Sequence, residues 1–151
     1  MPEEKYNKIV RELIKKSFPE LKSHKIIFKE TNLTYGVRVY YFYFFSLYLI
    51  GRGREKGLSK GGLAHELSHI EMFKNWGFWK TALLSFLQFF SMKIRRKIEA
   101  GADVNAIKKG YGKELYKARK RTLSKVDERI KRLIKKYYLS PKEIKSYTKR
   151  Y

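Results

Sequence analysis

Residues 65–69 read His-Glu-Leu-Ser-His, an H-E-x-x-H element, and this pattern constrains the chain more than any other feature of its sequence. On an α-helix, side chains four positions apart lie on the same face, so the imidazoles of His65 and His69 can bind one metal ion together. Glu66 then projects beside them, where its carboxylate can act on a metal-bound water. The alternative is that the two histidines merely lie at the edge of the core.

The sequence around this element favours a helix. Residues 57–62 contain several glycines and a candidate N-cap, Ser59. From Leu63 onward, apolar residues recur at helical spacing. The paired glycines just before Leu63 cost helix stability, but they would allow a neighbouring element to approach closely.

Zinc in a catalytic site needs a third protein ligand. The chain has no Cys, and its remaining His, His24, lies near the start of a predicted strand, where a lone His is usually a surface or half-buried residue. Glu99 is the best candidate, because it shares a helix face with Asp103 and small residues at positions 100–102 and 106 would let this second helix pack tightly against the first. Alternatively, Glu99 and Asp103 form a solvated acidic patch that pairs with neighbouring bases.

The two motifs together resemble those of the gluzincin metallopeptidases, in which H-E-x-x-H is followed by E-x-x-x-D. The segment Ile98–Asp103, with Ala106 and residues 110–112 after it, is similar to the E-x-x-A-D region of the CAAX prenyl proteases and heat-shock membrane metallopeptidases. In size the chain resembles the minimal archaeal minigluzincins. The resemblance covers about Ile26 to Tyr116, and the chain departs from the family's pattern in the spacer between the motifs, which is unusually aromatic.

This resemblance implies a role for each motif residue. Zn²⁺ would be bound by His65, His69 and Glu99, and Glu66 would be the general base. Asp103 would orient His65, as outer carboxylates commonly do for metal-bound imidazoles.

The resemblance also implies an α+β fold, a zincin-like metallopeptidase domain. A small mixed sheet would lie over the H-E-x-x-H helix, beside a second ligand-bearing helix and a basic C-terminal helix. A donor for the oxyanion is expected as well. Tyr111, Tyr116 and Arg121 are the candidates, and the sequence does not choose among them.

Three segments rich in β-branched and aromatic residues predict strands, at Lys25–Lys29, Val37–Tyr43 and Ser46–Arg52. Gluzincins hold an extended peptide substrate as an added strand at the edge of such a sheet. The order along the chain favours Val37–Tyr43 as that edge. The alternative is that these aromatic residues only build core.

The length of 151 residues predicts a single domain, with an N-terminal helix at about residues 1–20, a catalytic core at 25–110 and a basic helical region at 112–151. The formal net charge is +22, of which residues 93–151 contribute +15. Such a surface attracts polyanions, but no zinc finger, RNA-recognition signature or Gly-rich phosphate loop supports nucleic acid as a partner. A long helix is expected after Gly112, and Ser140–Glu143 is a capping box that predicts a short terminal helix.

An apolar stretch, Trp76–Met92, separates the two motifs and is followed by basic residues up to Lys97. One membrane span here would put the motifs on opposite sides of a bilayer, which leaves a core helix, a re-entrant hairpin or an interfacial helix that contacts an anionic membrane surface. The absence of Cys and a polar N-terminus predict a cytoplasmic protein, peripheral at the inner membrane face if the stretch is interfacial. Abundant Lys and Glu would suit a thermophile.

The sequence therefore predicts a zinc metalloendopeptidase. Two other interpretations stay open. One is a catalytically silent, basic membrane- or nucleic-acid-binding protein with a vestigial zinc site. The other is a latent enzyme, a zymogen whose own tail at residues 140–151 fills the cleft.

Overall fold

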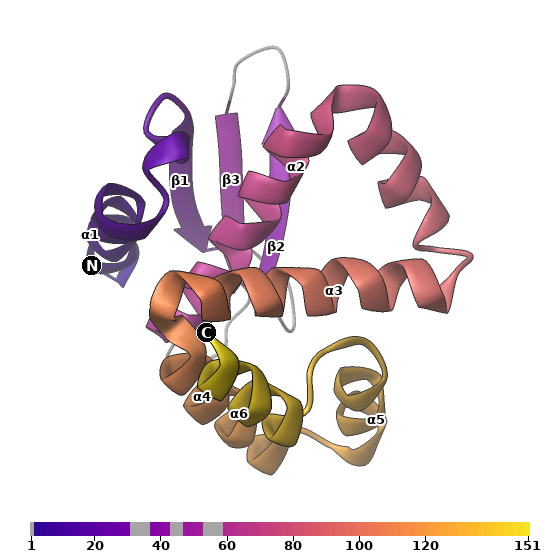
Figure 1. The fold of residues 1–151 in the computed structure, drawn as a ribbon. Coiled ribbons are helices and arrows are strands. Elements are labelled where there is room, and N and C mark those ends of the chain that lie inside the picture. The colour runs from indigo at the N-terminus through magenta and orange to yellow at the C-terminus, as the bar shows by residue number, and fades with distance from the viewer. Residues whose placement is uncertain (1, 31–36, 43–46, 53–58) are drawn as a thin grey trace.

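The computed structural model describes residues 2–30, 37–42, 47–52 and 59–151. In Figure 1, α2 crosses in front of the sheet, α3 runs below it, and the last three helices lie on the far side of α3. The elements follow in the order α1 (Pro2–Ser17), η1 (Pro19–Leu21), β1 (Lys25–Glu30), β2 (Val37–Phe42), β3 (Leu47–Arg52), α2 (Lys60–Leu87), α3 (Met92–Ala106), η3 (Ile107–Tyr111), α4 (Gly112–Lys125), α5 (Glu128–Tyr137) and α6 (Pro141–Arg150).

Polar N-cap residues fix where four of these helices begin. Ser59, Ser91, Asp127 and Ser140 each accept a hydrogen bond from a backbone N–H in the first turn of α2, α3, α5 and α6. Such caps satisfy N–H groups that have no partner inside the helix. At Ser140 the cap is reciprocal, because Glu143 accepts the Ser140 backbone N–H at 2.7 Å. The N-cap at Ser59 and the capping box at Ser140 are both confirmed.

The strands form one sheet in the order β1-β3-β2, in which β3 pairs in parallel with β1 and antiparallel with β2. The β1 edge is covered by α1, since Asn7 donates to the Phe28 carbonyl oxygen at 3.0 Å and accepts the Phe28 N–H at 2.8 Å. Within the described ranges, β2 forms the opposite edge, as its position along the chain suggested. Tyr43 and Ser46, at the ends of the predicted strands, lie outside the described residues.

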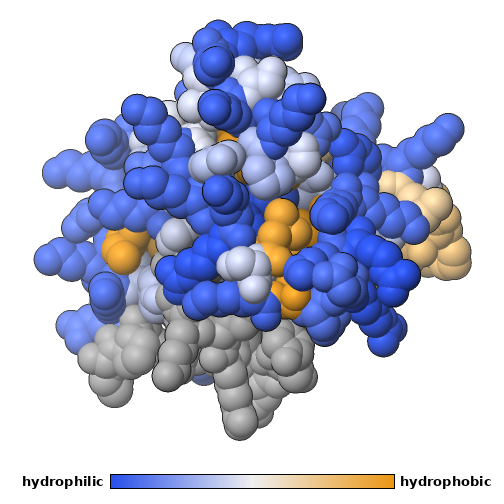
Figure 2. All heavy atoms as spheres, turned by 90° about the horizontal axis from the view of Figure 1, so that it is seen from below, coloured by the Kyte–Doolittle hydropathy of each residue, from blue (hydrophilic) through white to orange (hydrophobic). Residues whose placement is uncertain are grey.

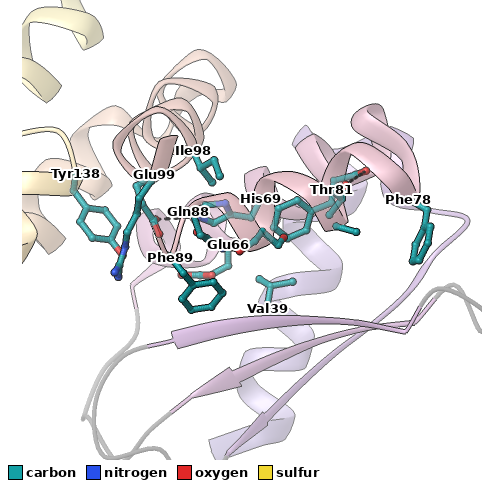
Figure 3. A pocket seen from close by; sticks show the side chains of 14 residues that line it. Val39, Glu66, His69, Phe78, Thr81, Gln88, Phe89, Ile98, Glu99 and Tyr138 are labelled. Carbon is teal, nitrogen blue, oxygen red and sulfur yellow. Dashed lines mark hydrogen bonds and ion pairs between the residues drawn. The ribbon is translucent and has the colours of Figure 1, made fainter. Parts of the chain in front are cut away.

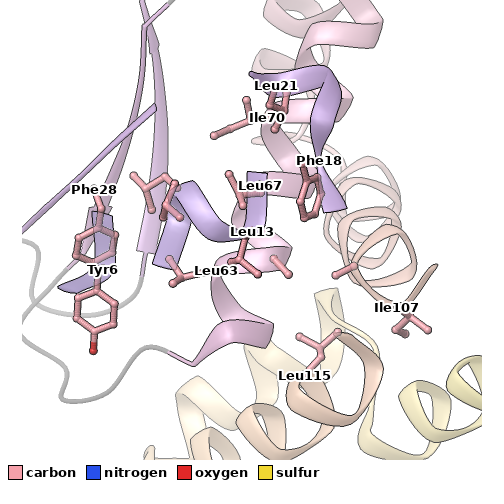
Figure 4. Close-up of a cluster of buried hydrophobic side chains, with 14 of the residues drawn as sticks. Tyr6, Leu13, Phe18, Leu21, Phe28, Leu63, Leu67, Ile70, Ile107 and Leu115 are labelled. Atoms are coloured by element: carbon pink, nitrogen blue, oxygen red, sulfur yellow. The ribbon is translucent and has the colours of Figure 1, made fainter. Parts of the chain in front are cut away.

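One hydrophobic core joins the sheet and α1 to α2, η3, α4 and α6 (Figure 4). Leu63, Leu67 and Ile70 recur at helical spacing along α2 and are fully buried. Val10 of α1 and Phe28 of β1 are buried against the same cluster. Each such side chain stabilises the fold by about 1.5–3 kcal/mol through burial. The core therefore fixes the first half of α2, where the H-E-x-x-H element lies.

The predicted α+β zincin-like class is wrong, because helices dominate the molecule. Every element from Lys60 to Arg150 is helical, and among the described residues strands occupy three segments of six residues each. The physical reason lies in composition. The second half of the chain is rich in Lys, Arg, Leu and Ile at helical spacing, and even its aromatic stretch after Trp76 continues as helix as far as Leu87.

The basic region after Gly112 is not one long helix. Helix α4 ends at Lys125, and the Asp127 cap starts α5. Residues 140–151, which the latent interpretation puts in the cleft, instead form α6, which packs on α4 and buries Ile144 completely. The C-terminal region is thus part of the hydrophobic core, and Ile144 is its buried residue on α6.

Residues 76–92 do not form a core helix, since Thr81 alone of these residues is buried. They continue α2 as far as Leu87 and then turn into α3. Among the helices in the described part of the chain, none is both long enough and apolar enough to cross a membrane.

Candidate metal centre

Helix α2 presents the two predicted histidine ligands on one face. His65 and His69 are one helical turn apart, both side chains are buried, and their Nε2 atoms are 3.1 Å apart. Glu66 is half-buried and directs its carboxylate into the adjoining pocket (Figure 3). The spacing of the motif therefore has the expected effect: two imidazoles converge while the intervening carboxylate stays separate.

Helix α3 brings Glu99 to the two histidines. Glu99 Oε2 lies 3.2 Å from His69 Nε2 and 3.4 Å from His65 Nε2. Gly101 contributes to the close packing of the two helices, since a Cβ atom there would lie 3.4 Å from Met72 Cε of α2. Glu99 therefore lies with the two histidines, and these three residues form a group that could hold a metal ion.

The triangle of ligand atoms fits zinc. Its edges measure 3.1, 3.2 and 3.4 Å. A tetrahedral zinc ion at 2.0–2.1 Å from each ligand keeps its ligand atoms about 3.3–3.4 Å apart. Two imidazoles and one carboxylate are also a donor set that catalytic zinc sites use. Zn²⁺ is thus compatible with the site without rearrangement of the ligands.

Asp103 connects the site to the C-terminal helices. The carboxylate is fully buried and accepts a hydrogen bond from His65 Nδ1 at 2.8 Å and from the Leu139 backbone N–H at 2.9 Å. Arg119 of α4 donates to its two oxygens at 3.0 and 3.1 Å, and to the Leu139 carbonyl oxygen at 2.9 Å. With Nδ1–H donating to Asp103, Nε2 is the ring nitrogen of His65 that faces His69 and Glu99.

The charges in this network shift several pKa values. Burial would lower the pKa of His65, but the charge of Asp103 and the hydrogen bonds that His65 donates to Asp103 and Glu99 raise it to about 10. Burial would raise the pKa of Glu99 and of Asp103, but other groups lower both. At Glu99 these are hydrogen bonds and positive charge from His65 and His69, and at Asp103 they are His65, the charge of Arg119 and the Leu139 N–H. Burial raises the pKa of Glu66, with Glu99 and Asp103 adding to the effect.

The two histidines are held differently. His65 is fixed from both ring nitrogens, whereas His69 Nδ1 is buried and has no hydrogen-bond partner in the part of the chain that the structure describes. Phe73 lies beside the His69 ring, with centroids 5.9 Å apart. The orientation of His69 therefore depends on its Nε2 contacts and on packing.

A pocket of about 640 Å³ opens beside the ligands (Figure 3). Glu66, His69 and Glu99 form its polar end, and Val39 of the edge strand β2 closes one side. Its remaining wall comes from α2, from the turn that follows it, from α3 and from Tyr138, and it combines apolar side chains with the polar Thr81, Ser85, Gln88 and Arg95. The lining residues there include Phe73, Phe78, Ala82, Phe89 and Ile98.

The structure puts the three predicted oxyanion donors away from this pocket. The Tyr111 hydroxyl pairs with Ser17 Oγ at 2.8 Å, Tyr116 is half-buried against the core, and Arg121 is exposed on α4. None of them lines the pocket. His24 is also remote, beside Ser23, as expected for a lone histidine.

Sequence reasoning missed two residues of the site, Arg119 and Tyr138. Arg119 is one of 36 basic residues, and its only signal was its place one turn after the apolar Leu115 on α4. Tyr138 follows α5, and its ring lies 5.7 Å from that of His65 and 4.6 Å below the Arg119 guanidinium. Burial raises the pKa of Tyr138, and the charges of Glu99 and Glu66 raise it further.

Comparison with family models, curated proteins and solved structures finds no match to this chain.

Proposed function

We propose that this chain is a zinc-dependent metallopeptidase that hydrolyses peptide bonds. One observation supports the proposal above all: the donor atoms of His65, His69 and Glu99 meet within 3.4 Å of one another, beside a carboxylate that is not part of the group. That carboxylate belongs to Glu66, which faces the same pocket. A purely structural histidine cluster would have no use for it.

The residues divide the chemistry between them. A zinc ion held here would polarise the scissile carbonyl and lower the pKa of water. Glu66 takes a proton from water in the pocket and gives it to the leaving amine, and its raised pKa suits a group that must both accept and release a proton. Asp103 holds the His65 ring by its Nδ1–H.

Tyr138 is the best candidate for the oxyanion donor. It lines the pocket beside Glu66 and Glu99, and its raised pKa keeps the phenol protonated, so that it can donate. Tyr138→Phe should lower kcat by roughly 10²- to 10³-fold, as for other lost oxyanion donors. Its zinc content should not change.

The substrate in this proposal is an extended peptide. It lies along β2 near Val37–Tyr43, as an added strand, because β1 is covered by α1 while Val39 of β2 borders the pocket. The apolar side chains of the pocket wall, such as Phe73 and Ile98, would accept a hydrophobic side chain next to the scissile bond. The lack of Cys supports a location inside the cell, at the inner membrane face if the exposed apolar residues contact lipid.

The test combines metal analysis with a peptide library. Protein expressed with zinc should contain one zinc per chain, and His69→Ala with Glu99→Ala should lose it. Glu66→Gln should keep zinc and fold but lose hydrolysis. Zinc retained in the His69→Ala, Glu99→Ala variant contradicts the ligand set. Stoichiometric zinc with no hydrolysis by the parent would favour the silent binding protein instead.

A further inference from the structure

The chain bends sharply after Trp76, and the bend starts an arm that consists of residues 77–92. Gly77 has φ 73° and ψ 175°, outside the helical region and in a conformation that side-chain-bearing residues rarely adopt. The second half of α2 therefore leaves the direction of the first half, and α3 returns towards the body from the tip (Figure 1). The arm carries its side chains outward over most of its surface.

Large apolar side chains are concentrated on this arm. Trp79, Phe89 and Phe90 are 83%, 82% and 76% exposed. Phe86 is exposed too, with its ring 5.1 Å from that of Phe90. Figure 2 shows apolar side chains projecting at one side of a mostly hydrophilic face. Exposed patches of this kind mark interaction sites in soluble proteins, since they are costly to leave in water.

Basic residues flank this apolar tip along the chain. Residues 74–98 contain six Lys and Arg and no Asp or Glu. Lys80, Lys93, Arg95 and Lys97 are all exposed, and Arg96 forms an ion pair with Glu143. A second copy of the chain would bring the same positive charge and a net +22 of its own, so self-association through the tip is opposed electrostatically. An anionic surface with an apolar interior complements both features.

We propose that the arm docks the protein on anionic membranes, with Trp79, Phe89 and Phe90 entering the interface and the flanking bases meeting lipid headgroups. The arm lies on the bilayer and does not cross it. Phe78 and Phe89 both line the metal-site pocket and belong to this exposed group. The pocket therefore opens beside the docked surface, and, if the proposed peptidase function is right, its substrates are polypeptide segments held at that surface.

Docking is tested by flotation with vesicles of phosphatidylcholine alone or with phosphatidylglycerol added. We use the Glu66→Gln protein, so that the result does not depend on catalysis. Binding should require the anionic lipid, weaken in 0.5 M salt, and shift the Trp emission to the blue. Trp79→Phe should abolish most of the shift. Lack of binding at low salt, or equal binding to neutral vesicles, would overturn the proposal.

Substitution of the tip provides the matched comparison. The triple change Trp79→Gln, Phe89→Gln, Phe90→Gln should weaken partitioning at least tenfold, whereas Leu133→Gln, at an exposed apolar residue on α5, should leave it unchanged. Lys93→Gln and Lys97→Gln should each weaken it about fivefold, the usual effect of one interfacial base. Circular dichroism confirms that the variants are folded. An unchanged triple variant, or tip-dependent dimers in light scattering without vesicle binding, contradicts docking by this arm.

The substrate half of the proposal has its own measurement. Cleavage of a vesicle-anchored peptide should exceed cleavage of the same peptide in solution by at least tenfold, and the tip variant should lose that preference. Equal rates for a bound, active protein would overturn this half and leave docking intact. Absence of hydrolysis of any peptide would count against the proposed function, and flotation would still decide the role of the arm.

Discussion

Arg119→Met should destabilise the protein by about 3–5 kcal/mol, because it leaves the Asp103 carboxylate buried without its guanidinium partner. The magnitude follows from burial: Asp103 is inaccessible and Arg119 is 8% exposed, so solvent screens little of their interaction. The variant also loses the hydrogen bond to the Leu139 carbonyl oxygen. His65 still faces Asp103, which favours the lower end of the range, about 3 kcal/mol. The melting temperature should then fall by roughly 6–12 °C for a chain of this size.

The assay is urea unfolding at pH 7 with a chelator present, so that zinc binding does not contribute to the measured stability. Arg121→Met is the matched control, since Arg121 lies two residues further along α4 and is exposed. It should change stability by about 0.5 kcal/mol or less. In an Asp103→Asn background, Arg119→Met should cost at least about 2 kcal/mol less than in the parent. A loss below about 1 kcal/mol for Arg119→Met alone would refute the buried network.

Three further predictions concern the surroundings of the site. Gly61→Ala should lower the free energy of unfolding by about 1–3 kcal/mol, since its Cβ would lie 2.6 Å from the Glu114 carbonyl carbon. Gly101→Ala should leave the stability unchanged or raise it, and urea unfolding compares the two variants. Asp103→Asn should weaken zinc binding roughly ten- to a hundredfold in competition with a chelator dye. The backbone hydrogen bond at Ser140 lowers the pKa of Glu143. The ionised Glu143 carboxylate therefore stabilises the fold fully above the ordinary pKa of Glu, and this stabilisation is lost as the pH falls through the lowered pKa. The stability difference between the parent and Glu143→Gln should therefore shrink on acidification below about pH 4.5, and a constant difference would contradict this.

The convergence of His65, His69 and Glu99 could be predicted from the sequence because most of the relevant interactions are local. His65 and His69 belong to one helical turn, and so do Glu99 and Asp103 on the second helix. Only one long-range contact had to be predicted, the packing of the His65 helix against the Glu99 helix, and small residues such as Gly101 indicated it. Short-range hydrogen bonds likewise made the caps at Ser59 and Ser140 predictable.

The other residues of the site could not be predicted, because they depend on tertiary contacts that no local sequence pattern indicates. Nothing in the sequence distinguishes the buried Arg119 from the exposed Arg121 except the phase of an intermittent apolar stripe. Tyr138 lines the pocket and Tyr111 does not, and this difference depends on how the α5–α6 connection folds back to Asp103 through the Leu139 N–H. The overall class was misjudged because the family resemblance rested on two helices, which say little about how much sheet surrounds them.

The Asp103 network makes the metal site and the C-terminal fold mutually dependent. Asp103 fixes the His65 ring on one side and, on the other, holds Arg119 and the backbone that precedes α6. A ligand that prefers this arrangement of His65 must also favour the packed positions of α4 and α6, because His65 and these two helices are held by the same Asp103 carboxylate. Zinc should therefore slow hydrogen exchange in α6, which contributes no ligand. Conversely, truncation after Leu139 removes Ile144 from the core and should weaken zinc binding rather than release a blocked cleft. An α6 that exchanges equally fast with and without bound zinc would show that the two regions are independent.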